Sequence, residues 1–275
     1  MRYTISDLQE KAFEARARFI ELFSNLGYGH LTTAFSETEI LISLFLEVMD
    51  YEPQKPDSDR FVLSKGHGAG MLFPIFELAG LMTKEETAEI LKVGGSSKKF
   101  NRLFYPGFDF YGGSLGMGLG MATGLSLASR MNRSRSITYC LMGDAECYEG
   151  SVWEAMLFAG HNELNNLVAI IDRNYLGCSD FTEDMCRLEP FEEKWRSCNW
   201  DVINVDGHDI KALTEAMRDV EKHKSKKPLC VIADTVKGKG VDYLCNIPLM
   251  HGFMPKGENA AMAIRALYDY YEDKE

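Results

Sequence analysis

The stretch Ile137-Thr-Tyr-Cys-Leu-Met-Gly-Asp144 joins a mostly apolar run to a glycine and an aspartate, and Leu167-Val-Ala-Ile-Ile-Asp-Arg-Asn174 joins a second apolar run to an asparagine. Short apolar runs of this kind indicate buried strands, and residues 152–164 between them have the apolar spacing of a helix. Two strands joined by one helix form a βαβ unit with parallel strands. We therefore expect Asp144 and Asn174 to lie at the same edge of one sheet.

The rest of the chain alternates strand-like and helical segments in the same way. Further strands are predicted at residues 60–63, 201–205 and 229–233, and helices at 6–26, 36–48, 114–131, 209–223 and 258–271. Ser6 with Gln9, and Ser36 with Glu39, have the spacing of capping boxes at two of these helix starts. The pattern predicts an α/β fold, a single domain over residues 1–275 whose mostly parallel sheet is flanked by helices on both faces. Ligands of such sheets bind beyond the carboxyl ends of the strands.

The charge balance, 30 Lys and Arg against 41 Asp and Glu, gives a net charge of −11. This argues against a protein that binds nucleic acid through its phosphates, so an anionic ligand would need a metal and backbone amides. The N-terminus lacks the basic and apolar regions of a secretory signal, and the apolar stretch from Ile40 to Val48 is too short to span a bilayer. We expect a soluble, cytoplasmic protein that binds neither nucleic acid nor membrane.

Seven cysteines are scattered along the chain without a Cys-x-x-Cys pair. An odd number in this arrangement favours reduced thiols over a disulfide framework or a zinc site. Cys140 and Cys230 fall inside apolar runs, so we predict that both are ordinary core residues.

Asp144 and Asn174 offer a carboxylate and an amide oxygen at the predicted sheet edge, and the backbone carbonyl near Leu176 adds a third oxygen. Mg²⁺ prefers such ligands and shares its coordination shell with phosphate oxygens. Backbone amides around Gly143 to Glu146 suit a diphosphate. Taken singly, Asp144 would be a helix cap and Asn174 a turn residue. Their spacing together with the two strands instead favours a metal and diphosphate site.

Eight segments together resemble the N-terminal domain of transketolase, in the family's order and over nearly the whole chain. They are Gly29-His30, Asp59-Arg-Phe-Val-Leu-Ser-Lys-Gly-His-Gly68, Gly113-Ser-Leu-Gly-x-Gly-Leu119, Gly143-Asp-Ala-x-x-x-Glu-Gly150, Ile171-Asp-Arg-Asn174, Asp206-Gly-His-Asp209, Thr235-Val-Lys-Gly-Lys-Gly240 and His251-Gly252. The resemblance implies the thiamine-diphosphate-binding fold and a transketolase-type transferase. Its cofactors would be thiamine diphosphate and Mg²⁺, for which Ca²⁺ or Mn²⁺ can substitute.

The resemblance also assigns roles to single residues. His67 and His251 match histidines near the diphosphate and the reacting carbon, and His30 matches one that exchanges protons with the substrate. Imidazole suits this work because it donates or accepts a proton near neutral pH. The metal ligands would be Asp144, Asn174 and the Leu176 carbonyl. The cofactor contacts would be His67, Gly113, Leu115, Gly143, Asp144, Ala145, Glu149, Asn174, Leu176, Lys237 and His251. The other histidines are predicted to be structural: His208 as a cap or turn residue, and His161 and His223 on helices.

The chain ends at Glu275, whereas the family continues with a pyrimidine-binding domain and a C-terminal domain. In the family, a glutamate on a second domain activates the cofactor. We therefore expect a separate C-terminal subunit carrying that glutamate, in an α₂β₂ assembly, and poor turnover by this chain alone. The resemblance places Glu154 at the subunit interface. The helix face formed by Val152, Trp153, Met156, Leu157 and Gly160 is expected either to contact the partner or to pack in the core.

The substrate-facing loop departs from the family. Transketolases carry a Gly-His-Pro segment before the glycine-rich stretch, and here the region reads Lys99-Phe-Asn-Arg-Leu-Phe-Tyr-Pro-Gly107. The side chains from Phe100 to Phe104 would shape a different pocket for a sugar or sugar phosphate. Arg102 suits a phosphate, carboxylate or sulfonate, and a solvated loop is the alternative.

Other functions fit the sequence less well than ketol transfer. A dinucleotide-binding module is excluded because the glycines at 116, 118 and 120 have the wrong period, and no P-loop sequence is present. A non-catalytic scaffold subunit is disfavoured by the joint presence of the metal ligands and three histidines. Within the thiamine diphosphate class, a deoxyxylulose-phosphate-synthase-like enzyme or a 2-oxoacid dehydrogenase or decarboxylase subunit remains an alternative. The Lys65-Gly-His-Gly and Lys237-Gly-Lys-Gly segments favour transketolase, with the cofactor acting as electron sink during C–C cleavage.

Overall fold

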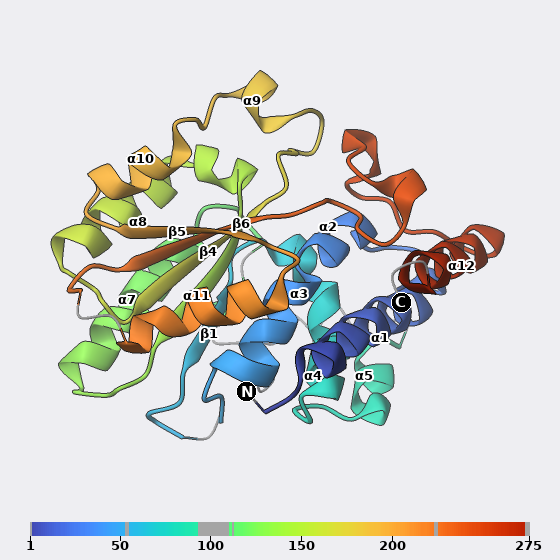
Figure 1. Cartoon of the computed structure of the whole chain (residues 1–275), viewed down its shortest axis with the longest axis horizontal. Helices are drawn as coiled ribbons and strands as arrows, with labels where there is room; N and C mark the ends of the chain where they lie inside the picture. The colour runs from blue at the N-terminus through green and yellow to red at the C-terminus, as the bar shows by residue number, and fades with distance from the viewer. Residues whose placement is uncertain (1, 53–54, 93–109, 112, 223–224, 273–275) are drawn as a thin grey trace.

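Six parallel strands form one sheet in the order β2-β1-β3-β4-β6-β5 (Figure 1). The computed structural model describes residues 2–52, 55–92, 110–111, 113–222 and 225–272. The strands are β1 (Arg60–Leu63), β2 (Phe110–Tyr111), β3 (Thr138–Gly143), β4 (Leu167–Arg173), β5 (Asp201–Asp206) and β6 (Leu229–Asp234). Every residue of β4 is buried, as expected for a central strand with helices on both faces.

Alternate residues of each central strand enter two separate cores. Tyr139 and Leu141 of β3 pack into one core, whereas Cys140 and Met142 pack into the other. This follows from the period-two alternation of side chains along a strand. Cys140 and Cys230 are fully buried in the second core, which confirms the prediction for both, and all seven cysteines are free thiols.

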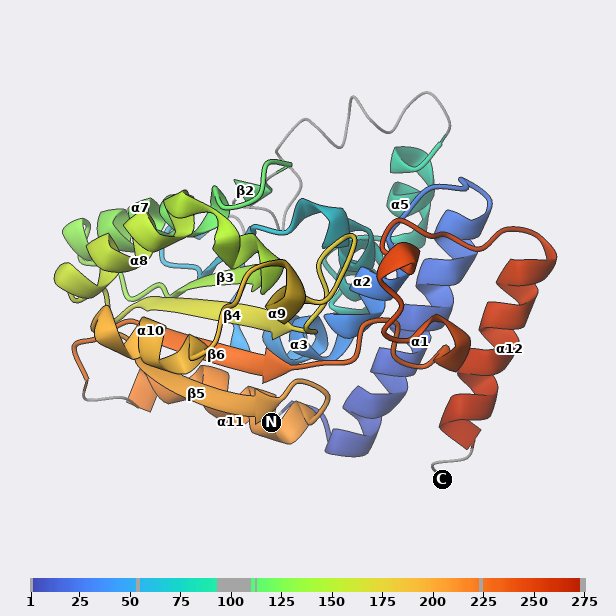
Figure 2. The same cartoon turned by 90° about the horizontal axis from the view of Figure 1, so that it is seen from above.

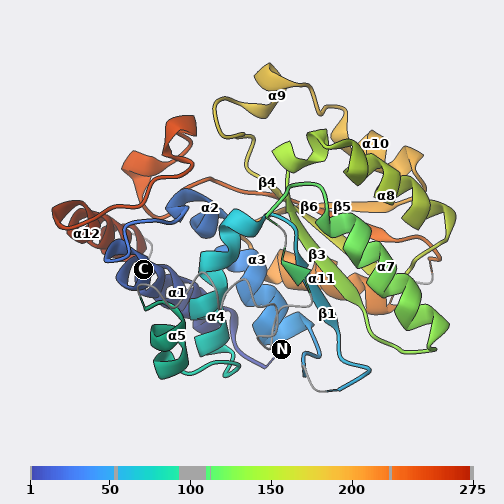
Figure 3. The same ribbon diagram turned by 180° about the vertical axis from the view of Figure 1, so that it is seen from behind.

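The second core is covered by α7 (Gly118–Met131), α8 (Gly150–His161) and α10 (Phe191–Ser197). Figure 2 shows α7 and α8 on one face of the sheet and α11 (Ile210–Lys222) on the other. The first core is larger and includes helices at one end of the sheet, where Figure 3 shows α1, α4 and α12 together. These further elements are α1 (Ile5–Ser24), α2 (Leu31–Ser36), α3 (Thr38–Ile42), η1 (Ser43–Val48), η2 (Gly66–Met71), α4 (Leu72–Leu78), α5 (Lys84–Ile90), η3 (Ala145–Tyr148), α9 (Thr182–Met185), η4 (Asp242–Leu244), η5 (Pro248–Met250) and α12 (Glu258–Glu272).

Both predicted capping boxes are wrong. The box at the start of α1 is formed by Thr4 and Asp7 instead of Ser6 and Gln9. At the second, the helix expected from 36 to 48 is divided into α2, α3 and the π-helical η1. The Ser36 hydroxyl donates to the Asp172 carboxylate at 2.6 Å, and Glu39 binds Arg16. Tertiary contacts with buried charges therefore take the side chains that the local pattern assigns to a cap.

No helix in the described ranges is both long enough and apolar enough to cross a membrane.

Gly160 marks the closest packing between α8 and the sheet's outer segments. A Cβ built on Gly160 would lie 1.8 Å from the Cys198 carbonyl oxygen, which is backbone. We expect Gly160→Ala to lower the free energy of unfolding by about 3 kcal/mol, because overpacking of this kind forces the backbone to shift. Urea denaturation of the purified chain measures the loss.

Gly124→Ala is the matched control, because Gly124 also lies within a helix but its Cβ would meet nothing within 4 Å. Replacement of a helical glycine by alanine is expected to raise stability by about 0.5–1 kcal/mol at such a site. Equal effects of the two substitutions would show that the contact with Cys198 does not limit this position.

Candidate active site

The carboxyl ends of four neighbouring strands meet at one edge of the sheet and carry polar side chains there. Lys65 follows β1, Asp144 follows β3, Asn174 follows β4, and Lys237 lies shortly after β6. The parallel register aligns Gly143 with Asp172 and Arg173 with Asp234 in adjacent strands. The sheet therefore brings these side chains together although up to 172 positions separate them in the sequence.

The two predicted metal-ligating side chains lie together. The Asp144 carboxylate accepts a hydrogen bond from the Tyr175 backbone N–H at 2.6 Å, and the Asn174 amide oxygen accepts one from Leu176 N–H at 3.2 Å. Tyr175 has a φ of 62°, a left-handed conformation that folds the Asn174–Leu176 turn over Asp144. The simpler roles predicted for both residues also hold, because Asp144 caps η3 through Ala145 N–H and Asn174 makes a turn.

The donor set fits a hard cation. It consists of a carboxylate, an amide oxygen and a backbone carbonyl, all oxygen donors and all from buried residues. Burial, opposed in part by Arg173 nearby, raises the pKa of Asp144 to about 6. In the part of the chain that the structure describes, no group of three His, Cys, Asp or Glu side chains could hold a metal, so a cation here depends on Asn174 and the Leu176 carbonyl.

Lys237 lies against the same turn. Its ammonium donates to the carbonyls of Leu176 and Gly177, both at 3.3 Å, and lies 3.0 Å from Nδ1 of His251. Burial lowers the pKa of this lysine to about 8. A cation held beside oxygen ligands in this way suits an anionic group that bridges it to a metal, as a phosphate does.

The three predicted catalytic histidines form one cluster. The ring centroids are 5.4 Å apart for His30 and His67, 5.2 Å for His30 and His251, and 4.9 Å for His67 and His251. Burial, with Lys65 nearby, lowers the pKa of His67 to about 2, and burial with Lys237 nearby lowers that of His251 to about 4. Burial also lowers the pKa of His30. All three imidazoles are therefore neutral at pH 7 and able to accept a proton.

A buried ionic cluster, which the sequence patterns did not predict, lies beneath the site. The Lys65 ammonium lies 2.9 Å from Glu37 and also binds Asp172, and all three side chains are at most 1% exposed. Asp172 accepts further hydrogen bonds from the Ser36 and Thr235 hydroxyls. Burial raises the pKa of Glu37 to about 7, whereas for Asp172 the Lys65 charge outweighs burial and lowers the pKa.

Glycine makes room for this cluster at position 68. A Cβ on Gly68 would lie 2.4 Å from a carboxylate oxygen of Glu37, which is fully buried and has little freedom to move. The available signal was the charged residue Lys65 directly after an apolar strand. An aspartate within the apolar run of β4 was the other.

Glu146 is a second residue to which the sequence patterns assigned no role. Its carboxylate accepts hydrogen bonds from Gly116 N–H at 2.8 Å and Gly143 N–H at 3.1 Å, and from the Ser64 hydroxyl. Burial raises its pKa. Glu146 thus joins the glycine-rich stretch to the ends of β1 and β3. A Cβ on Gly118 would lie 2.3 Å from Ser64, so at this position the neighbouring protein chain requires the glycine.

The remaining predicted cofactor contacts lie on the outer side of the edge. Gly113, Leu115 and Glu149 are exposed, and Ala145 is half-buried with its N–H donated to Asp144. The segment from Phe100 to Phe104, which includes Arg102, lies outside the residues that the structure describes.

Glu154 is exposed in a groove of about 370 Å³ between α7 and α8, which Gly120 and Phe158 also line. The helix face predicted around it is divided. Val152, Met156 and Gly160 are buried in the chain's own core, Trp153 is half-buried, and Leu157 is exposed. Exposed apolar side chains nevertheless gather near the groove: Met117, Met121, Leu157 and Phe158.

Comparison with known proteins identifies one family. The thiamine diphosphate binding domain of transketolase matches residues 9–274. One of the named subunits of apulose-4-phosphate transketolase from Phocaeicola vulgatus is 33% identical over 274 residues, which cover 98% of this chain and 97% of the relative. The 6-deoxy-6-sulfo-D-fructose transketolase subunit SqwG of a Clostridium species is 34% identical, over 86% of this chain and 87% of the relative.

Longer relatives match over part of their length. Rat transketolase is 34% identical over 97% of this chain, and the match covers 43% of the rat protein. The structure of transketolase from Leishmania mexicana superposes with a TM-score of 0.81 at 24% identity, over 100% of this chain and 45% of that one. At this identity the likeness establishes the fold.

Proposed function

Because this chain belongs to the transketolase family through its thiamine diphosphate binding domain, we propose that it is the diphosphate-binding subunit of a two-chain transketolase. The enzyme would transfer a two-carbon ketol unit from a ketose donor to an aldehyde acceptor. One observation carries the proposal: two relatives that are named as subunits of a transketolase match over 87% or more of their own length. The predicted thiamine-diphosphate-binding α/β fold and the transferase class agree with these matches.

In this proposal the turn from Asn174 to Leu176 and the Asp144 carboxylate bind Mg²⁺, and Lys237 compensates the charge of the diphosphate. The support is the shared location of buried oxygen donors and one ammonium. Thiamine diphosphate, when bound, supplies the nucleophilic carbon and the electron sink for C–C cleavage.

The three histidines would hold and move protons at the substrate. Neutral imidazoles in one cluster can accept a proton from a substrate hydroxyl and return it to the product alkoxide. The support is their mutual distance and the lowered pKa of each ring. His30, His67 and His251 are therefore proposed as the catalytic residues.

The partner would be a C-terminal subunit that carries the activating glutamate, in an α₂β₂ assembly. The names of the two relatives, each given as one subunit, support a partner chain. We propose that Glu154 and the exposed apolar residues beside the α7–α8 groove form the interface between subunits.

The substrate would be a sugar or sugar phosphate. The two relatives are named for apulose 4-phosphate and for a 6-sulfo sugar, so both names include an anionic sugar. Arg102 and its neighbours from Phe100 to Phe104 are proposed to select the substrate, because a guanidinium pairs with phosphate and sulfonate alike.

The test is reconstitution from two separately purified chains. This chain alone, with Mg²⁺ and thiamine diphosphate, is expected to show less than about 1% of the turnover of the mixture, because residues that activate the cofactor lie on the partner. The assay measures the aldehyde released from a ketose donor. Full turnover by this chain without a partner would disprove the two-chain proposal, and a mixture that binds cofactor without turnover would support a scaffold instead.

A further inference from the structure

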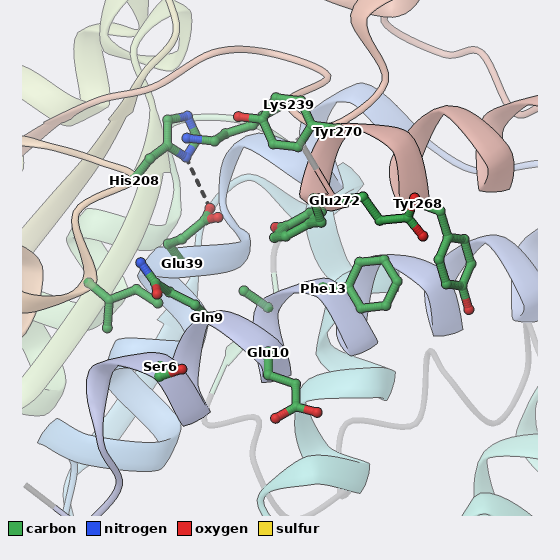
Figure 4. Close-up of a pocket in the computed structure, with 13 residues that line it drawn as sticks. Ser6, Gln9, Glu10, Phe13, Glu39, His208, Lys239, Tyr268, Tyr270 and Glu272 are labelled. Atoms are coloured by element: carbon green, nitrogen blue, oxygen red, sulfur yellow. Dashed lines mark hydrogen bonds and ion pairs between the residues drawn. The ribbon is translucent and has the colours of Figure 1, made fainter. Parts of the chain in front are cut away.

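A chain of buried polar contacts connects helix α1 to the segment that carries Lys237. The Arg16 guanidinium donates to both carboxylate oxygens of Glu39, at 2.8 and 2.7 Å. Glu39 lies 3.0 Å from Nδ1 of His208, and Nε2 of His208 lies 2.8 Å from the backbone nitrogen of Val236. Figure 4 shows the His208–Glu39 contact in the wall of a cavity of about 720 Å³.

The hydrogen bonds fix the protonation of His208. A backbone N–H can only donate, so Nε2 of His208 must accept the bond from Val236 and carry no proton. The proton lies on Nδ1 and is donated to the Glu39 carboxylate. Burial opposes ionisation of Glu39, but the adjacent Arg16 outweighs it and holds the pKa of that carboxyl well below its usual range. The imidazole is therefore oriented at both nitrogens.

The prediction that His208 caps a turn is wrong. Asp209 caps α11, because its carboxylate accepts from the N–H groups of Lys211 and Ala212. Asp206 accepts from the backbone N–H of His208 itself. The local turn is thus complete without the imidazole, whose two bonds both go to distant segments, 169 and 28 positions away.

The bond to Val236 acts one residue before Lys237. On the other side of Lys237, the Gly238 N–H donates to the Thr32 carbonyl at 2.9 Å. Two bonds therefore hold the backbone on either side of the lysine whose ammonium contacts Leu176 and Gly177. Loss of the Val236 bond would free the segment at a half-buried N–H and let the ammonium move relative to the turn.

We infer that His208 is a positioning residue for cofactor binding: through the Val236 backbone it holds the Lys237 ammonium at the candidate diphosphate site. This inference rests on the proposed function. A purely structural His208 would stabilise the fold without changing cofactor affinity, and the experiment must separate these roles.

Two substitutions divide the functions of the imidazole. In His208→Asn the side-chain amide can still donate to Glu39 but is too short to reach Val236. In His208→Gln the amide oxygen can reach Val236 as an acceptor. Tyr271→Phe is the stability control, because it removes the Tyr271 hydroxyl that accepts from Arg16 at 2.8 Å and leaves the bond to Val236 intact.

The measurement is the dissociation constant of thiamine diphosphate at saturating Mg²⁺ for the assembled two-chain enzyme, by calorimetry well below the melting temperature. We expect His208→Asn to raise it about tenfold and His208→Gln to raise it less than about threefold, the range of one lost hydrogen bond. At saturating cofactor, kcat should change less than about twofold, since the bond positions the cofactor's anchor.

Two results would overturn the inference: an unchanged dissociation constant in His208→Asn, or an equal increase in Tyr271→Phe. A wild-type enzyme that binds no thiamine diphosphate would instead refute the proposed function, so the two failures are distinguishable.

Discussion

Asp144→Ala is expected to abolish the thermal stabilisation that Mg²⁺ and thiamine diphosphate together give this chain. At a cofactor concentration about 100 times the dissociation constant, the wild-type chain should gain about 2.7 kcal/mol. For a domain of this size, that gain corresponds to about 5 to 10 °C in melting temperature. The variant should gain nothing, because Asp144 supplies the carboxylate of the proposed metal site.

The shift must be measured for each variant against its own cofactor-free sample. Removal of Asp144 also removes its bonds to the N–H groups of Ala145 and Tyr175, so the cofactor-free variant itself should melt earlier. Asp184→Ala serves as control, because Asp184 is an exposed aspartate on α9. A full cofactor-induced shift in Asp144→Ala would remove this residue from the metal site.

Lys65→Met is expected to destabilise the fold strongly, with a loss of about 3 to 5 kcal/mol at pH 8. It leaves the carboxylates of Glu37 and Asp172, both fully buried, without their shared cation. Each would then have its pKa raised in the folded state. Such groups stabilise the fold below the unfolded pKa, near 4 for a carboxyl, and this contribution is lost as pH rises. The deficit should therefore shrink toward pH 5.

Urea denaturation at pH 5 and pH 8 measures this pH dependence. Lys92→Met is the matched control, because Lys92 forms an ion pair with Glu89 on the surface, where such pairs contribute little. Addition of Glu37→Gln to Lys65→Met should restore part of the stability by removing one buried charge. A deficit that is the same at both pH values would contradict the proposed cause.

Sequence alone predicted the parts of the fold that depend on local pattern. The strands on either side of α8 and the shared edge of Asp144 and Asn174 followed from apolar runs and parallel topology. The capping boxes did not, because Ser36 and Glu39 bind Asp172 and Arg16, which lie 136 and 23 positions away. No local pattern contains such partners.

The same limit applies within the site. The histidine cluster joins three segments that only the family resemblance connected in advance. Lys65 and Asp172 were passed over because their pairing spans 107 positions, and an isolated charge near a strand end carries no sign of its partner. His208 was assigned to a turn because its motif is local, whereas both ring nitrogens bind distant segments.

The contact between Glu37 and Gly68 has a consequence for how this chain can evolve. A methyl group at position 68 would occupy the space of the Glu37 carboxylate, at 2.4 Å. An ancestor or descendant with alanine at 68 must therefore first carry a shorter residue at 37, and the reverse order passes through a poorly folded intermediate. The two positions should change as a pair across related sequences, and the order of their substitutions along a lineage should be fixed.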